Sequence, residues 1–331
     1  MKIVIAGAGE VGTHLAKLLS NEGLDIILID PDELRLQVVD SNYNLMTQTG
    51  SPTAFKKLKE AGVNHTDLYI AVTPFETRNI VSCSMAKHLG AKKTVARIDN
   101  YEFLKPEYKP FFKGIGVDEL IYPENFASLE IISALRHSWA RNWFELYNGE
   151  LTLIGVKLRE NAQLIGMQLK ELASSGHSFH ISAIRRKHET IIPRGDDHLE
   201  VGDIAYFTTQ RQNVENVMNI CGKKQHHIRR ILIMGGSRIG TQLANMLDDS
   251  YRIKIIEMDR DKCLKLIKQV PDNCQIVNGD ARDIDLLKDE GISDYDAFIA
   301  LTDSSETNIL ACLTAKEFGV KKTIAEVENI Q

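Results

Sequence analysis

One short pattern occurs twice in this chain and limits what it can fold into. Residues 2–12 read Lys-Ile-Val-Ile-Ala-Gly-Ala-Gly-Glu-Val-Gly, and residues 230–240 read Arg-Ile-Leu-Ile-Met-Gly-Gly-Ser-Arg-Ile-Gly. Each copy is an apolar run that breaks at glycines and continues with apolar residues at helical spacing. A strand, a tight glycine turn and a helix start make a dinucleotide-binding unit. The sequence therefore predicts an α/β fold with two Rossmann-like, doubly wound parallel sheets.

The residues after each turn are predicted to form a helix with one apolar face. Apolar residues at i, i+4, i+7 and i+8 lie on the same side of a helix. They are Val11, Leu15, Leu18 and Leu19 in the first copy, and Ile239, Leu243, Met246 and Leu247 in the second.

The glycines of the first copy have separate expected tasks, and an acidic residue completes the pattern. Gly7 permits the turn, Gly9 lets the backbone approach a pyrophosphate, and Gly12 lets the helix close on the strand. Asp30 ends the next predicted strand, near the spacing of about 20 residues expected of a ribose-binding acid. The alternative for Asp30 is a helix N-cap before Pro31.

Further candidates lie where later strands of the first unit end, because ligands of open α/β sheets bind at the carboxyl ends of the strands. Strands are predicted at 26–29, 42–49, 68–72, 94–98 and 115–122, and helices at 53–60 and 76–89. The strand ends add Gly50, Ser51, Thr73 and Pro74 as candidates. Arg97 either reaches a phosphate or forms a surface ion pair, and the sequence leaves both readings open.

The second copy differs from the first at positions that would face a ligand. Its ribose acid is Glu257, Ser237 replaces a glycine and narrows the approach to a pyrophosphate, and Arg238 supplies a cation at the helix start. Glu326 stands at the position of Arg97 and would repel a phosphate. The two sites should therefore prefer different ligands, or one should bind weakly. The other candidates in this copy are Gly235, Gly236, Ile239, Gly279, Asp280 and Thr302.

A helix predicted over residues 124–143 is apolar on more than one side. A helix of this kind is usually buried on several faces. It is either an internal core helix or a subunit-exchange element between two chains, and the pattern favours the second. The apolar residues are Phe126, Leu129, Ile131, Ile132, Leu135, Trp139 and Trp143.

A smaller α+β domain is predicted after this helix. Short alternating strands near 154–158, 181–183, 191–192 and 205–207, with turn residues between them, are typical of a small antiparallel unit. Helices are predicted at 163–173 and 213–220. The predicted domains are 1–122 and 230–331 (Rossmann-like), 123–147 (crossover helices), 148–222 (small domain) and 223–229 (linker).

Composition excludes several classes of function. A formal net charge of −5 gives no basic field for nucleic acid, and no apolar stretch reaches the roughly 20 residues needed to span a bilayer. The five cysteines form no C-x-x-C pair, and the adjacent histidines His226 and His227 are poorly placed to bind a metal. The chain enters a strand at once, which leaves no room for a signal peptide and predicts a cytoplasmic location.

The order Rossmann unit, small domain, Rossmann unit resembles the TrkA family, the regulatory subunits of bacterial Trk potassium uptake systems. Domains of this family belong to the class that regulates conductance of K⁺, called RCK or KTN domains. The resemblance spans essentially the whole chain. In the small domain it rests on residues 166–172, 184–186, 192–196 and 201–203, which follow the pattern of the family's C-terminal module.

The resemblance implies a nucleotide sensor that performs no chemistry. Its ligands would be NAD(H), with ATP or ADP particularly at the second site, and its partner a membrane-embedded Trk translocation subunit of the TrkH or TrkG type. It also implies a homo-oligomer, a tetramer in the intact protein, on the inner face of the bacterial inner membrane. The residues carried over are Gly7, Ala8, Gly9, Glu10, Val11, Asp30, Thr73, Pro74 and Arg97, then Gly235, Gly236, Ser237, Arg238, Ile239, Glu257, Asp280 and Thr302.

Two further expectations concern the end of the chain and the competing function. By internal symmetry, the second unit lacks an equivalent of 115–143 and of a following small domain, so we expect a C-terminally truncated chain. The alternative function is an NAD-dependent oxidoreductase, which needs a general acid beside the nicotinamide. The histidines are scattered and form no recognisable acid–base group.

Overall fold

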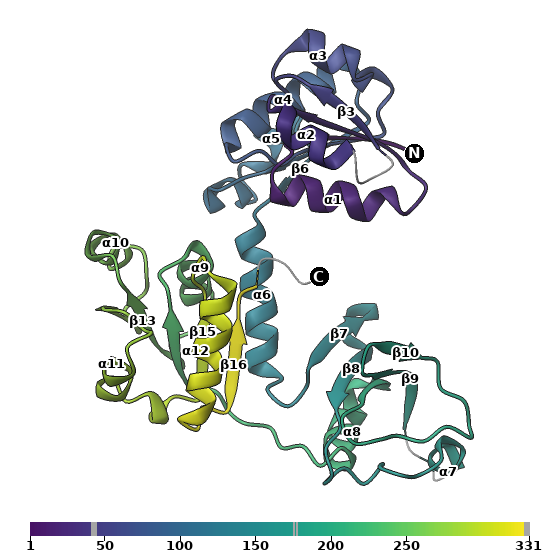
Figure 1. The fold of residues 1–331 in the computed structure, drawn as a ribbon, viewed down its shortest axis with the longest axis vertical. Helices are drawn as coiled ribbons and strands as arrows, with labels where there is room; N and C mark the ends of the chain where they lie inside the picture. Colours follow the sequence, from purple (N-terminus) through teal and green to yellow (C-terminus); the bar gives the residue numbers. More distant parts are fainter. Residues whose placement is uncertain (41–44, 175, 177, 328–331) are drawn as a thin grey trace. The chain divides into compact units, whose positions relative to one another are not determined.

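The computed structural model describes residues 1–40, 45–174, 176 and 178–327, and the chain forms two compact units, Met1–Pro123 and Glu124–Gln331 (Figure 1). The first unit holds a six-stranded parallel sheet in the order β3-β2-β1-β4-β5-β6. This is the doubly wound order, in which the crevice for a ligand opens between β1 and β4. The strands are β1 Lys2–Ala6, β2 Asp25–Asp30, β3 Met46–Thr49, β4 Leu68–Ala71, β5 Lys93–Arg97 and β6 Glu119–Ile121.

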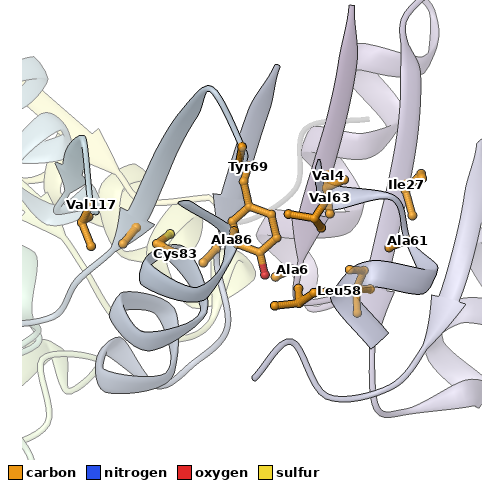
Figure 2. Close-up of a cluster of buried hydrophobic side chains, with 14 of the residues drawn as sticks. Val4, Ala6, Ile27, Leu58, Ala61, Val63, Tyr69, Cys83, Ala86 and Val117 are labelled. Carbon is orange, nitrogen blue, oxygen red and sulfur yellow. The ribbon is translucent and has the colours of Figure 1, made fainter. Parts of the chain in front are cut away.

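Helices cover both faces of this sheet. Alternate residues of β1 point to opposite faces, so that Ile3 and Ile5 belong to one apolar cluster and Val4 and Ala6 to the other. Figure 2 shows the second cluster, with Tyr69 of β4 lying among its neighbours. The helices are α1 Glu10–Ser20, α2 Glu33–Asp40, α3 Phe55–Glu60, α4 Glu76–Leu89 and α5 Lys109–Gly114, with short 3₁₀ turns at Val63–His65 and Tyr101–Leu104.

The predicted apolar face of α1 is partly wrong. Val11 and Leu18 are 45% and 53% exposed, whereas Gly12 and Ala16 are buried. The helix lies so close to the glycine turn at Gly12 that small residues face the sheet; Leu15 and Leu19 still pack against the core, whereas Val11 and Leu18 are turned outward. Predicted elements were also too long in this unit: β6 is shorter than 115–122, α3 is shorter than 53–60, and residues 42–44 of the predicted third strand lie outside the described residues.

The second unit contains a five-stranded parallel sheet that repeats the first arrangement. Its order is β14-β13-β12-β15-β16, so the crevice lies between β12 and β15. The strands are β12 Arg230–Met234, β13 Arg252–Glu257, β14 Cys274–Asn278, β15 Ala297–Ala300 and β16 Lys322–Ala325. The helices are α9 Arg238–Met246, α10 Arg260–Leu266, α11 Ile284–Asp289 and α12 Ser305–Glu317, with a 3₁₀ turn at Ile292–Asp294.

An antiparallel sheet precedes this Rossmann-like part in the chain. Its order is β10-β9-β11-β8-β7, and Ile154, Val156 and Phe207 are buried at the centre of its core. The strands are β7 Asn142–Leu146, β8 Leu151–Lys157, β9 Phe179–Arg186, β10 Glu189–Ile191 and β11 Ile204–Gln210. The helices are α7 Leu169–Ser174, shorter than predicted, and α8 Val214–Ile220, with 3₁₀ turns at Tyr147–Gly149 and Arg211–Asn213.

Helix α6 (Pro123–Arg136) ends earlier than the predicted helix over 124–143. Trp143 instead belongs to β7, where it pairs with Ile154 of β8. Its aromatic side chain suits a strand, and pairing along β8 outweighs helical spacing. Trp139 also lies beyond the helix. The antiparallel sheet therefore begins before residue 148, the start predicted for the small domain.

The apolar residues of α6 divide into a buried and an exposed group. Ile131, Ile132 and Leu135 are buried in one cluster with β12 and α9, whereas Phe126 and Leu129 are 61% and 47% exposed. Packing of α6 between two chains stays a prediction. Within the described part of the chain, none of the helices has the length and apolar character that crossing a membrane requires.

Candidate functional site

The first glycine turn follows β1 and lies beside the end of β4, since a Cβ at Gly7 would lie 3.0 Å from the Thr73 nitrogen. Gly7 has φ +112°, and its N–H donates to the carbonyl of Ile29 at 2.8 Å. A Cβ at Gly12 would lie 1.8 Å from the Gly7 carbonyl oxygen, so only glycine fits the start of α1. A Cβ at Gly9 would meet no described atom within 4 Å. Gly12 is thus required by packing, while the space beside Gly9 is open to a ligand.

Asp30 holds this turn from the end of β2. Its carboxylate accepts hydrogen bonds from the N–H of Ala8 at 2.7 Å and from that of Asp32 at 2.8 Å, and the side chain is 7% exposed. The cap of α2 is Asp32, which accepts from the N–H groups of Leu34 and Arg35. Asp30 is therefore not the N-cap of α2. It combines the predicted ribose position with a structural task.

An asparagine that we did not predict as a site residue joins two strand ends of the first unit. Asn79 of α4 is 1% exposed, and its amide nitrogen donates to the carbonyls of Thr73 and Arg97, both at 2.9 Å. Its amide oxygen accepts from the N–H of Thr73 at 2.9 Å and from its hydroxyl at 2.6 Å. This asparagine clamp fixes the backbone at the ends of β4 and β5.

The ion pair that the structure describes for Arg97 is a loose one. Its guanidinium nitrogen Nη2 lies 3.9 Å from Asp99, and its Nε is buried with no hydrogen-bond partner in the part of the chain that the structure describes. A buried guanidinium N–H without an acceptor is costly. This arrangement favours the phosphate reading over a purely structural ion pair. The other candidates lie around the same turn and strand ends. Glu10 and Val11 are exposed at the start of α1, and Pro74 follows Thr73. The N–H of Gly50 donates to the Asp30 carbonyl, and the Ser51 hydroxyl is hydrogen-bonded to that of Thr53.

In the second unit all the candidates of the second copy line one cavity of about 460 Å³, a volume typical of small-molecule sites. Gly235 and Glu326, which are about 90 positions apart, both line it because the glycine turn and the ends of the strands lie at the same edge of the sheet. The lining includes Gly235, Gly236, Ser237, Arg238, Ile239, Glu257, Gly279, Asp280 and Thr302, all predicted, and also Glu124, Lys262, Asp303 and Glu326.

The turn geometry of the first unit recurs here. Gly235 donates to the Ile256 carbonyl at 2.9 Å, and Glu257 accepts from the N–H of Gly236 at 2.8 Å and from that of Asp259 at 2.9 Å. The asparagine clamp recurs in Asn308, which bonds Thr302 and the carbonyl of Glu326. Both copies therefore place the acid and the strand ends in the same way.

Several side chains that line this cavity differ from their counterparts in the first unit. The hydroxyl of Ser237 accepts from the N–H of Gly240 at 3.2 Å and caps α9, so it occupies a helix N–H that could serve a phosphate. Nζ of Lys262 lies 2.9 Å from Oε2 of Glu257. The guanidinium of Arg282 donates to the Asp280 carboxylate through Nε at 3.0 Å and Nη2 at 2.7 Å. Lys262 went unpredicted because nothing in its sequence surroundings marks it.

The stability of the second Rossmann-like part should depend on pH through the carboxylate of Glu257. Burial raises its pKa, but hydrogen bonds from Asp259, Lys262 and Gly236 outweigh burial and leave the pKa below its ordinary value of 4.5. The resulting stabilisation is complete above the unfolded pKa and is lost as the pH falls through the folded pKa. We expect the second Rossmann-like part to lose stability below about pH 4.5, and Glu257→Gln to reduce that loss.

Hydrogen exchange of the β12 and β13 amides in denaturant, measured between pH 3 and 7, checks this expectation. Glu317→Gln, an exposed change on α12, is the control. If wild type and Glu257→Gln lose stability equally steeply as the pH falls, Glu257 is not the group responsible for the acid sensitivity.

Comparison with known proteins gives the family. The TrkA-N domain family matches residues 3–123 and 231–331, and the TrkA-C domain family matches residues 153–222. The matches cover both Rossmann-like sheets and most of the antiparallel sheet. Known relatives named Trk system potassium uptake protein TrkA are 32% identical in Halomonas elongata, 33% in Haemophilus influenzae and 34% in Vibrio alginolyticus. The alignments cover 99–100% of this chain and 72–73% of those proteins.

Solved structures agree with the fold. The GsuK RCK domain superposes with a TM-score of 0.67 at 16% identity, covering 98% of this chain and 68% of that one. The GsuK channel bound to NAD superposes with a TM-score of 0.66, also at 16% identity, covering 98% and 57%. Two sheets of the same strand order, the intervening small domain and the family matches lead to one conclusion: this chain belongs to the TrkA family of Trk system potassium uptake proteins.

Proposed function

We propose that this chain is a cytoplasmic nucleotide-sensing subunit of a Trk-type potassium transporter. The observation that carries the proposal is a repeated arrangement, in which an acid at the end of a strand, Asp30 or Glu257, accepts a hydrogen bond from a backbone N–H of the glycine turn. That acid is the group that binds a ribose in dinucleotide sites. NAD(H) is the expected ligand of the first site, and NAD(H), ADP or ATP that of the second. The names of two similar GsuK structures, one bound to NAD and one to ADP, support this choice.

The sensing mechanism follows from the position of the ligand. A nucleotide in the crevice contacts the glycine turn, the helix start and the strand ends, which the asparagine clamps hold together. Ligand binding biases the transporter only by its different affinity for two states, typically ~1–3 kcal/mol per site. A homotetramer on the cytoplasmic face, docked on a TrkH- or TrkG-like translocation subunit, would add the contributions of several sites.

The test is nucleotide-dependent K⁺ flux. The full-length protein is reconstituted with its membrane subunit in liposomes, and flux is measured with NADH, NAD, ADP or ATP. We expect the flux to depend on the nucleotide, and calorimetry on the soluble protein to resolve two classes of site. Flux that is the same with every nucleotide would overturn the sensing function, and turnover of NADH with small carbonyl substrates would favour the oxidoreductase instead.

A further inference from the structure

Glu124 brings a buried carboxylate to the second cavity from helix α6. It is 7% exposed and lines the cavity, and its Oε1 lies 3.0 Å from Nη2 of Arg238. Its Oε2 is buried and lacks a hydrogen-bond partner among the residues that the structure describes. A buried carboxylate oxygen without a donor is unfavourable. The negative charge of Glu124 is therefore offset mainly by Arg238.

Helix α6 does not depend on this ion pair for its position. The hydroxyl of Ser128 donates to the carbonyls of Glu124 at 2.8 Å and Ile239 at 3.3 Å, which joins α6 to the start of α9. Further along, Ile131 and Leu135 are buried in the cluster that contains β12 and α9. Packing holds the helix, so the charge of Glu124 can be removed without displacing α6.

Arg238 occupies the place where a nucleotide phosphate would bind. It is the first residue of α9, directly after the glycine turn, where N–H groups and the helix dipole attract anions. A guanidinium binds phosphate and carboxylate with the same planar geometry, so the two anions compete for it. In the first copy the corresponding residue is Glu10, and no such competition arises there.

We propose that Glu124 is a specificity-determining residue of the second cavity, whose carboxylate competes with ligand phosphates for Arg238 and thereby limits how many phosphates a ligand can carry. The proposal rests on the proposed nucleotide function. The neighbouring carboxylates of Asp303 and Glu326 also line the cavity and add to the repulsion. A dinucleotide, with one charge on each of two phosphates, is favoured over a triphosphate, whose charge is larger and more concentrated.

Calorimetry on the whole chain tests this competition with AMP, ADP, ATP and inorganic tripolyphosphate. Glu124→Gln keeps the shape of the side chain and removes its charge. We expect ATP affinity at the second site to rise on the order of tenfold, ADP affinity to rise less and AMP affinity least, with tripolyphosphate following ATP. The gain should shrink as KCl is raised, because salt screens the charges. The matched control is Glu130→Gln, an exposed change on the same helix.

The outcomes separate the two proposals. Equal affinities in wild type and Glu124→Gln, or the same gain for AMP and ATP, would overturn the competition and leave the nucleotide function standing. If no nucleotide binds but tripolyphosphate still binds more tightly to Glu124→Gln, the competition holds and the nucleotide function fails. Arg238→Gln should abolish the ranking by phosphate number, and hydrogen exchange of the α6 amides checks that both variants keep the helix docked.

Discussion

Gly12→Ala is expected to destabilise the first unit by about 3 kcal/mol or more and to abolish nucleotide binding there. The added methyl carbon would lie 1.8 Å from the Gly7 carbonyl oxygen, a backbone atom that cannot move without opening the glycine turn. Helix α1 would have to shift away from β1. Hydrogen exchange of the β1 and β4 amides in denaturant reports the stability of this unit separately from the rest of the chain.

The second copy supplies a matched control for this change. At Gly240 the added carbon would lie 3.3 Å from the Gly235 carbonyl oxygen, a tight contact that small adjustments relieve. Gly240→Ala should therefore cost less than about 1 kcal/mol. If the two variants lose similar stability, close packing of the helix on the turn does not explain the glycine in the first copy.

Asp30→Ala should weaken NADH binding to the first unit at least tenfold and also lower its stability by about 2–4 kcal/mol. The stability term follows because the buried N–H of Ala8 and the partly buried N–H of Asp32 both lose their acceptor. From sequence alone this substitution would be expected to spare the fold, and the two hydrogen bonds change that expectation.

Asp30→Asn separates the two effects. Its amide oxygen keeps one of the hydrogen bonds, so stability should recover in part, while the loss of the charged acceptor for a ribose hydroxyl leaves NADH binding weak. Calorimetry with NADH and hydrogen exchange of the β1 and β2 amides measure the two quantities on the same samples. Full NADH affinity in both variants would exclude Asp30 as the ribose acid.

The sheets were predictable from sequence because their determinants are local. Apolar strands, glycine turns and the acids Asp30 and Glu257 lie within short windows, and the repeat shows each of them twice. Helix α6 was predicted too long because helical spacing continues to Trp143, whereas that spacing takes no account of the pairing of Trp143 with Ile154 in the next strand, β8. Periodicity describes one element by itself and does not include the pairing that ends it.

The site was predictable in part for the same reason. Backbone positions around each turn follow from the motif, but the partners of its charged residues do not. Arg238 forms an ion pair with Glu124, which is more than a hundred residues away in the sequence. Lys262 forms one with Glu257 because α10 packs next to the end of β13. The role of Asn79 and Asn308 was missed although the repeat aligns them, since an asparagine in a helix has no distinctive pattern.

The asparagine clamps give the two Rossmann-like copies the same backbone frame. At the ends of β5 and β16, Asn79 and Asn308 donate to backbone carbonyls, those of Arg97 and Glu326. These hydrogen bonds therefore do not depend on which side chains the strand ends carry. The copies differ outside that frame at residues 9–10 and 237–238, and at the frame itself in the side chains of Arg97 and Glu326. If the two copies prefer different ligands, we expect that transferring one preference to the other copy requires exchanging the dipeptide after the turn together with the residue at the clamped strand end.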